Sequence, residues 1–302
     1  MKKLILPIVA LCLSASMQAE ENPLWMRYCA LSPDGQTIAF SYKGDLYTVP
    51  SSGGQANKLT SHPAHDTRPV WSPDSKQIAF ASNRDGNFDV YLINKEGGEA
   101  KRLTTHSANE YPVAFKDNQH ILYQANVMQE SSDIQFPGSR FIQIYEVATT
   151  GGRPHLYSPL HMEDMALSPD GKKILYHDYK GTEDPWRKHH QSSVARDIWL
   201  TTTDAKPTYQ KITTFKGEDR NPVWSPDGSA FYYLSEEKGS FNIFKRGLNQ
   251  STSQQITHHT THPVRFLSID KSGTMCYSFN GEIYTVKEGN KPSKVNIQVV
   301  SD

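Results

Sequence analysis

Apolar and polar residues alternate in short segments along almost the whole chain. The segments from Gln77 to Phe80 and from Phe88 to Leu92 are examples, and both are rich in β-branched and aromatic residues. Alternation with a period of two, in residues of these types, is typical of half-buried β-strands. Long aliphatic runs are few, so the pattern predicts many short strands and almost no helix.

A pattern of an apolar residue, Ser-Pro-Asp-Gly and an apolar strand recurs through the chain. The complete copies begin at Leu31, Trp71, Leu167 and Trp224, with Ser in place of Gly in the second, and degenerate copies begin near 115 and 269. Pro, Asp and Gly suit a tight turn, so each copy predicts two strands joined by that turn. Two more short strands follow each copy, for example 45–49 and 58–60.

Successive copies lie about 40 to 57 residues apart, which is the period of a propeller blade. The sequence therefore predicts an all-β protein, a six-bladed β-propeller of four-stranded antiparallel blades. The predicted domain covers 20–302, with blades near 24–61, 62–106, 107–158, 159–215, 216–258 and 259–302. We expect the alternating segment 295–300 to form the outer strand of the sixth blade, without a closing tail, as in a propeller that belongs to a longer polypeptide.

The first residues have the features of a cleavable signal peptide. Lys2 and Lys3 precede an apolar segment, 4–13, that is too short to span a bilayer. Ala19 before Glu20 is a suitable cleavage site, and Ser16 is an alternative because Met17 is imperfect at the third position before the cut. The bulky Leu11 disfavours lipidation of Cys12. We therefore expect residues 1–19 to be a signal peptide and the protein to be periplasmic, and no later segment is apolar enough to be membrane-spanning.

The net charge bears on the class of ligand, and the cysteines bear on whether the protein contains a disulfide. The 32 basic and 32 acidic residues balance, so nothing in the net charge favours nucleic acid or an anionic membrane. Cys29 and Cys276 remain after cleavage. The export that we expect would permit a disulfide between them, but we expect two free, buried thiols.

The repeat residues resemble the TolB-type propeller repeat, in particular Trp71 to Phe80, 82–86, 89–91 and 102–104. Residues 23–28, and the segment from Pro185 through Trp199, are similar to the N-terminal propeller of bacterial tricorn-type serine peptidases. This resemblance covers the whole mature chain. It implies a second propeller, a PDZ-like module and a catalytic domain downstream, none of which is in this sequence.

No catalytic residues are predicted, because the nucleophile elbow, the His-Glu-x-x-His zinc motif and the phosphate-binding loop are all absent. We also predict no cofactor and no metal. Seven histidines are expected on one rim of the ring, where solvated loop positions are favoured over metal ligation: His62, His65, His106, His161, His258, His259 and His262. Mixed charge is expected on the same rim: Asp66, Arg68, Glu110, Glu163, Asp164, Glu218, Asp219, Arg220 and Arg265.

Two long connections, 129–140 and 180–196, are expected on this rim as well. Long loops in a compact domain are often functional, and the basic, aromatic second loop suits a peptide carboxylate or a neighbouring domain. The predicted binding residues on the rim are Arg140, Trp186, Arg187, Lys188, His189, Arg196, Arg220 and Arg265.

These observations favour a non-catalytic module that handles or gates the substrates of an exported, tricorn-like serine peptidase. Its partners would be peptides or the downstream domains of the same polypeptide, or another protein. The alternative is a free-standing TolB-like periplasmic propeller that binds a protein, although such a protein would carry a small α/β domain before the propeller. A propeller enzyme in its own right is the third possibility.

Overall fold

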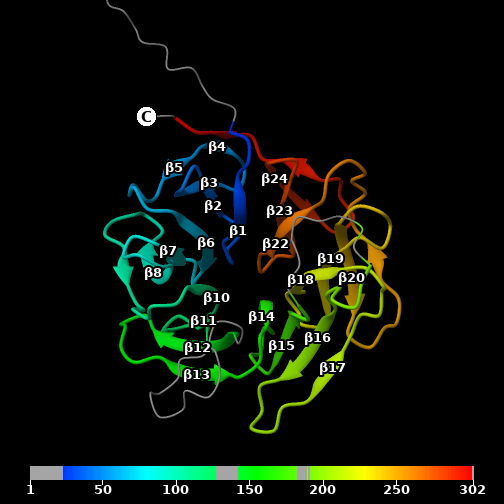
Figure 1. Cartoon of the computed structure of the whole chain (residues 1–302). Coiled ribbons are helices and arrows are strands. Elements are labelled where there is room, and N and C mark those ends of the chain that lie inside the picture. The colour runs from blue at the N-terminus through cyan, green and yellow to red at the C-terminus, as the bar shows by residue number, and fades with distance from the viewer. Residues whose placement is uncertain (1–22, 127–141, 182–188, 190, 301–302) are drawn as a thin grey trace, which may run out of the picture.

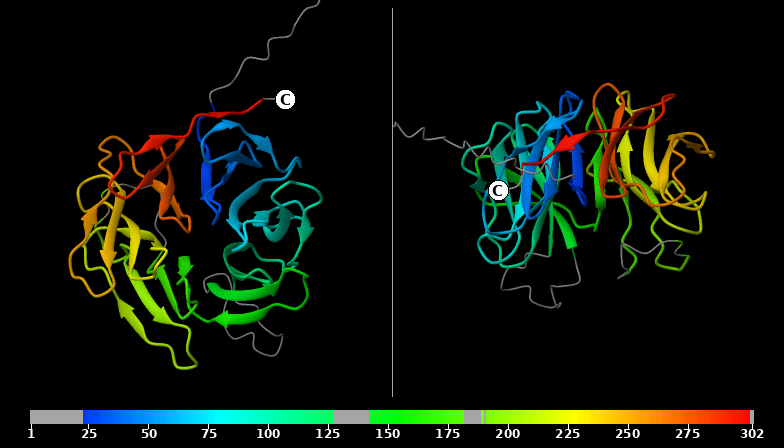
Figure 2. Two further views of the ribbon diagram at one scale, coloured as in Figure 1. Left: turned by 180° about the vertical axis from the view of Figure 1, so that it is seen from behind. Right: turned by 90° about the horizontal axis from the view of Figure 1, so that it is seen from above.

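The computed structural model describes residues 23–126, 142–181, 189 and 191–300. Six four-stranded antiparallel sheets stand in a ring around a central axis (Figure 1), and the described residues contain no helix. We call the region along this axis the channel, as is usual for β-propellers. The prediction of an all-β, six-bladed propeller is confirmed. Seen from behind and from above, the sheets lie side by side around the ring (Figure 2).

In every blade the strands follow one another outwards from the channel. The innermost strands are β1 (Arg27–Leu31), β6 (Asp66–Trp71), β10 (Glu110–Asp117), β14 (Glu163–Leu167), β18 (Asp219–Trp224) and β22 (Arg265–Ile269). The second strands are β2 (Thr37–Tyr42), β7 (Gln77–Ser82), β11 (His120–Asn126), β15 (Lys173–His177), β19 (Ala230–Ser235) and β23 (Thr274–Phe279). The third strands are β3 (Asp45–Pro50), β8 (Asp89–Asn94), β12 (Ile142–Ala148), β16 (Ile198–Thr202), β20 (Asn242–Gly247) and β24 (Glu282–Lys287).

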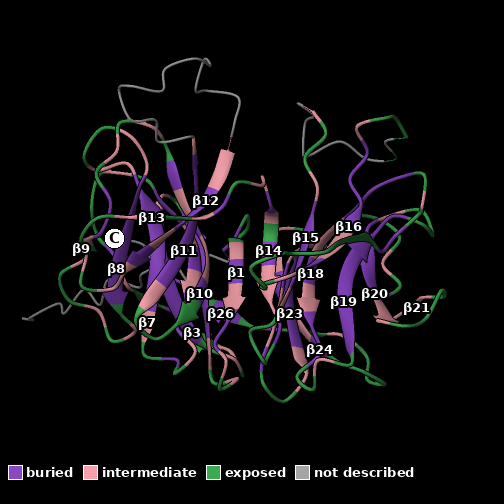
Figure 3. Ribbon diagram, turned by 90° about the horizontal axis from the view of Figure 1, so that it is seen from below, coloured by how far each residue is buried: buried purple, intermediate pink, exposed green. Residues whose placement is uncertain are grey.

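The fourth strands are short and lie at the circumference. They are β5 (Asn57–Lys58), β9 (Lys101–Arg102), β13 (His155–Ser158), β17 (Tyr209–Lys211), β21 (Gln254–Gln255) and β25 (Ser293–Lys294). The core lies between adjacent blades: the second strands are almost completely buried, and exposed residues concentrate in the connections (Figure 3). Indole groups also join blades, since Trp71 Nε1 donates to Ala30 O at 2.9 Å and Trp224 Nε1 donates to Ala166 O at 2.9 Å.

The Ser-Pro-Asp-Gly repeats are structural turns. In the first, the Ser32 hydroxyl donates to Asp34 Oδ1 at 2.6 Å, and the Gly35 amide donates to Ser32 O at 2.8 Å. Gly35 has a φ of 74°, which suits glycine, whereas Ser75 adopts the left-handed conformation at the equivalent place in the second repeat. The hydroxyls of the four complete repeats all bond to the aspartate of their own turn: Ser32, Ser72, Ser168 and Ser225.

The end of the chain differs from our expectation. The outer strand of the sixth blade is Ser293–Lys294, and the following strand β26 (Ile297–Gln298) crosses to the first blade, where it pairs in parallel with β4 (Gly54–Gln55). The prediction that 295–300 forms the outer strand of the sixth blade, with no closing tail, was therefore wrong. A period of two predicts a half-buried strand but does not identify its partner.

The tail packs tightly across this seam. Val295, Ile297 and Val299 are buried in one cluster with residues of the first and sixth blades. The amides of Gly54 and Ala56 each donate to the tail at 2.8 Å. Both ends of the described chain therefore lie at the same edge of the ring (Figure 1).

Cys29 and Cys276 lie at the same seam, on β1 and β23. Both are free, buried thiols in one apolar cluster. Burial raises the pKa of the Cys29 thiol, and the neighbouring Cys276 thiol raises it further.

Candidate functional site

Every innermost strand contains a β-bulge near its start, where two of its residues lie opposite one residue of the second strand. In the first blade, for example, Arg27 pairs with Ser41 but Ala30 pairs with Ala39. The register shifts in the same way in the second, fourth, fifth and sixth blades, and the third blade shifts twice, between Pro112 and Ala114 and between Phe115 and Asp117. We call this end of the ring, where the innermost strands begin, the channel mouth.

Five of the bulges hold a residue other than glycine in the left-handed conformation. These residues are Tyr28 (φ 52°), Arg68 (53°), Asp164 (46°), Asn221 (48°) and Phe266 (57°). Pro112 of the third blade is closest to the equivalent position, and proline cannot adopt a positive φ. Bulges of this kind redirect side chains and occur often beside functional sites.

The bulge side chains from different blades meet one another around the channel. The rings of Tyr28 and Phe266 lie 4.6 Å apart, and the Arg68 guanidinium lies 5.7 Å from the Tyr28 ring. The charge of Arg68 also acts on Asp164, two blades away. The innermost strands therefore place aromatic and charged side chains at the centre of the ring.

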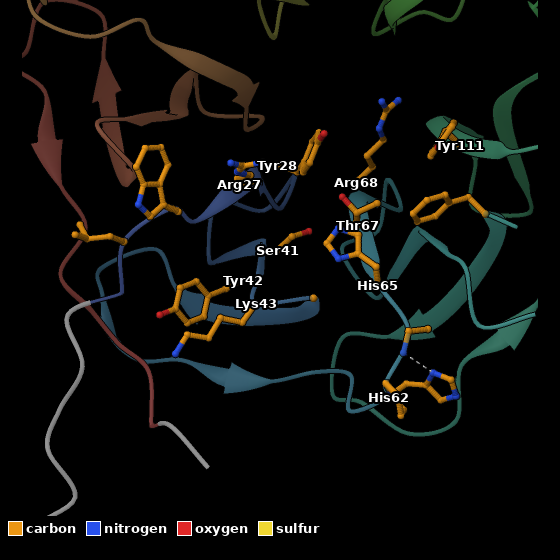
Figure 4. Close-up of a pocket in the computed structure, with 16 residues that line it drawn as sticks. Arg27, Tyr28, Ser41, Tyr42, Lys43, His62, His65, Thr67, Arg68 and Tyr111 are labelled. Carbon is orange, nitrogen blue, oxygen red and sulfur yellow. Dashed lines mark hydrogen bonds between the residues drawn. The ribbon is translucent and has the colours of Figure 1, made fainter. Parts of the chain in front are cut away.

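A cavity of about 1180 Å³ opens at the mouth over the first three blades. Its cationic lining residues are Arg27, Lys43 and Arg68, and none of the sixteen described residues that line it is Asp or Glu. The aromatic lining residues are Trp25, Tyr28, Tyr42, Phe88 and Tyr111. In Figure 4, Arg68 extends between Tyr28 and Tyr111, and its guanidinium lies 4.3 Å from the Tyr111 ring.

The opposite side of the mouth, on the fourth and fifth blades, carries carboxylates among arginines and histidines. His161 Nε2 lies 2.6 Å from Glu163 Oε1, and His177 Nδ1 lies 3.6 Å from Asp164 Oδ2. Burial lowers the pKa of His177 to about 3, so its ring is neutral at physiological pH and Nδ1 accepts the Asn221 amide at 3.3 Å.

The two neighbouring carboxylates on β14 differ in their pKa. Partial enclosure by the ring raises the pKa of Asp164 to about 6, and the charge of Glu163 adds to this rise. Burial acts in the same direction on Glu163, but the bond with His161 and the nearby positive charges outweigh it and lower its pKa to about 2. Glu163 is therefore ionised at neutral pH, and the two sides of the mouth differ in charge.

Comparison with known families identifies this architecture. The model of the tricorn protease N-terminal β-propeller domain matches residues 23–292, most of the chain. The chain belongs to the tricorn N-terminal propeller family. The crystal structure of the tricorn protease superposes with a TM-score of 0.74 at 20% identity, covering 93% of this chain and 27% of that one.

Two larger proteins share sequence with this tricorn-type propeller. Dipeptidyl-peptidase 5 of Porphyromonas gingivalis is 29% identical over 268 residues, which cover 70% of this chain and 37% of that protein. Tricorn protease homolog 1 of Streptomyces coelicolor is 25% identical over 281 residues, covering 92% of this chain and 25% of that protein. The match therefore spans 25% to 37% of the length of these relatives. TolB of Acinetobacter baumannii shares the fold, with a TM-score of 0.63 at 16% identity, covering 91% of this chain and 65% of that one.

The structure describes four of the eight rim residues predicted for this propeller. Arg140, Trp186, Arg187 and Lys188 lie outside the described residues. The His189 amide donates to Glu236 Oε2 at 2.7 Å, while its side chain is 65% exposed. Arg196 is buried and lies 3.4 Å from Glu218 Oε1, and Arg220 pairs with Glu218 as well. Arg265 is half-buried at the start of β22. Their role in binding stays a prediction.

The other expectations for the rim need one correction. Four of the acidic residues expected beside the channel mouth are buried within or between blades: Asp66, Glu110, Glu218 and Asp219. Asp66, for example, accepts two hydrogen bonds at 3.0 Å from the Arg84 guanidinium. Among the described residues, no group of three His, Cys, Asp or Glu side chains is placed to hold a metal ion. In the same part of the chain, no helix is long and apolar enough to cross a membrane.

The aromatic side of the mouth was not among the predicted binding residues. Tyr28, Phe88 and Tyr111 come from three blades, and each alone reads as an ordinary core residue. The signal was present in the repeat, since Tyr28 and Arg68 each precede their Ser-Pro-Asp turn by the same number of residues.

Proposed function

We propose that this chain is the non-catalytic, substrate-handling propeller of an exported, tricorn-like serine peptidase, and that peptides enter or leave at the channel mouth. Membership of the tricorn N-terminal propeller family supports the association with a peptidase. The catalytic domain would lie downstream in the same polypeptide. Export and a periplasmic location follow from the signal peptide expected in residues 1–19.

The observation that carries the proposal is the left-handed backbone at the five bulges. Glycine would adopt this conformation without the cost of about 1 kcal/mol or more that other residues incur. The chain uses glycine where its turns need a positive φ, as at Gly35 and Gly171, but it places Tyr, Arg, Asp, Asn and Phe at the channel. Strain of this kind persists where the side chains serve a purpose, and a channel that handles peptides needs polar and aromatic contacts.

Site-specific photocrosslinking in cells tests this proposal. A photoreactive phenylalanine analogue replaces Phe266 at the channel in one variant and Tyr209 on the outer strand β17 in the control; both positions already hold aromatic residues. We expect peptide adducts from position 266 and few from position 209. Equal labelling at both positions would contradict the proposal, and capture of one intact protein from position 266 would favour the free-standing protein-binding alternative. Cell fractionation and the N-terminal sequence of the mature protein test export.

A further inference from the structure

Planar side chains form a continuous arc around one side of the channel mouth. Phe266 contacts Tyr28 with ring centroids 4.6 Å apart, and Arg68 lies between Tyr28 and Tyr111, at 5.7 and 4.3 Å. Tyr111 continues to Phe88 at 5.4 Å. The arc joins the sixth, first, second and third blades, and its central member is a cation that lies between two aromatic rings (Figure 4).

These cation–π contacts hold the Arg68 guanidinium near the two rings but leave its N–H groups available. Within the described part of the chain, no side chain or carbonyl accepts a hydrogen bond from Arg68, whereas Arg84 of the same blade is paired with Asp66 at 3.0 Å. The charge of Arg68 acts to lower the pKa of Glu163 and of Asp164, which lie on the fourth blade. Neither forms an ion pair with it among the described contacts. Arg68 is half-buried where it lines the cavity, so its unpaired N–H groups are accessible to an anionic ligand.

The positive charge of the cavity favours an anionic ligand. Arg27 and Lys43 line the same cavity, and none of its described lining residues is acidic, although the chain as a whole is neutral. The fork of an arginine matches a carboxylate in a two-pronged geometry. Tyrosine rings on both sides provide apolar contact for the atoms next to that carboxylate.

We propose that the arc is a carboxylate-binding subsite for an extended peptide. The carboxylate, from an acidic side chain or from a C-terminus, is held by Arg68, and the adjoining apolar atoms lie against Tyr28 and Tyr111. This inference rests on the proposed function only for the identity of the ligand as a peptide. It adds a chemical preference, for acidic over neutral peptides, that the fold does not require.

Calorimetry with the full chain tests the subsite. The probes are acetyl-Gly-Pro-Glu-Pro-Gly-amide, its Gln counterpart, the Gln counterpart with a free C-terminal carboxylate, and glutarate. We expect the carboxylate-bearing probes to bind at least about tenfold more tightly than the fully neutral peptide, the range for a hydrogen bond to a charged group. Comparison of the Glu peptide with the C-terminal acid identifies which source of carboxylate the subsite takes.

Three variants connect the preference to Arg68. Arg68→Asn removes the guanidinium with a residue that tolerates the left-handed conformation, and should abolish the preference. Arg68→Lys keeps the charge but not the fork, and should bind with intermediate affinity. Lys76→Ala is the control, because it removes an exposed cation from a Ser-Pro-Asp turn at the far end of the ring, and it should bind like the wild type.

Unchanged affinity of the Glu peptide for Arg68→Asn, or equal binding of acidic and neutral peptides by the wild type, overturns the subsite but leaves the proposed function standing. Binding of glutarate that depends on Arg68, without binding of any peptide, supports the carboxylate site and contradicts the peptide-handling function. Absence of binding by every probe at millimolar concentration also overturns the subsite.

Discussion

The closing tail should be sensitive to a single methyl group at Gly53. A Cβ at this position would lie 2.6 Å from Asn296 O, well inside van der Waals contact, and Gly53 has a φ of 92°. The equivalent glycine of the second blade, Gly97, has a φ of 94° and no atom within 4 Å of its would-be Cβ. Both amides make the same turn bond, at 2.8 and 2.9 Å. Gly97→Ala is therefore a matched control that shares the backbone strain but not the clash.

The expected magnitudes follow from these contacts. The left-handed conformation costs either alanine about 1 kcal/mol. In Gly53→Ala the tail must also move away, which breaks two hydrogen bonds of 2.8 Å to Gly54 and Ala56, at about 1 kcal/mol each. Partial exposure of Ile297, now only 6% exposed, adds to this, since complete exposure of such a side chain costs about 1.5–3 kcal/mol. We expect Gly53→Ala to lose about 2–4 kcal/mol more stability than Gly97→Ala.

Urea unfolding followed by circular dichroism measures this difference as a shift in midpoint at constant slope. A third variant, in which residues 295–302 are deleted, completes the test. Adding Gly53→Ala to that deletion should cost only the strain of about 1 kcal/mol, because the clash is already gone. Equal stability of Gly53→Ala and Gly97→Ala would refute the reasoning and show that the tail does not hold the ring closed.

Three further predictions concern other parts of the ring. Burial, followed by the charge of Asp89, raises the pKa of Glu110 to about 7. The folded state therefore keeps a proton that the unfolded state releases near pH 4.5, and the free energy of unfolding falls by up to about 3 kcal/mol as the pH rises between these values. Glu110→Gln should remove that fall in urea titrations at pH 4 and pH 8, and an unchanged profile would contradict the assignment. Cys29 and Cys276 should react with a thiol reagent only after denaturation, and a purified protein two mass units lighter than its sequence would show a disulfide instead. Trp224→Phe should destabilise by about 2 kcal/mol, because it removes the bond to Ala166 O at 2.9 Å and part of a buried indole ring. Trp25→Phe, at a position 71% exposed, should have a melting temperature close to that of the wild type.

The blades could be predicted from the sequence because the turn chemistry is local. Ser32, Asp34 and Gly35 bond to one another within a few residues, so the residues needed for the turn are adjacent in the chain. The phase of the repeat then assigns the strands on both sides. The tail could not be predicted in this way, because Ile297 and Gly54 are distant in sequence and form only a two-residue parallel pair.

The candidate site could be predicted only in part from the sequence, because the bulges decide which side chains reach the channel. Charge and loop length predict Arg196 and Arg220 as binding residues on the rim, but both side chains pair with the buried Glu218. What decides whether a side chain reaches the channel is its place in the repeat. Three residues before the first residue of the repeats at 31, 71, 167, 224 and 269 stand Tyr28, Arg68, Asp164, Asn221 and Phe266.

The repeat therefore also indicates which residues lie at the bulges. In five of the six blades the bulge holds the position three residues before the turn segment in the left-handed conformation, with residues as different as Tyr, Arg, Asp, Asn and Phe, whereas the register of the third blade differs. The turn residues recur because they form the turn, whereas the residue at this position differs from blade to blade of this chain. In this chain that position places an arginine between aromatic rings on one side of the channel and an aspartate beside Glu163 on the other. The asymmetry of the channel therefore comes from a position of the repeat whose residue differs from blade to blade.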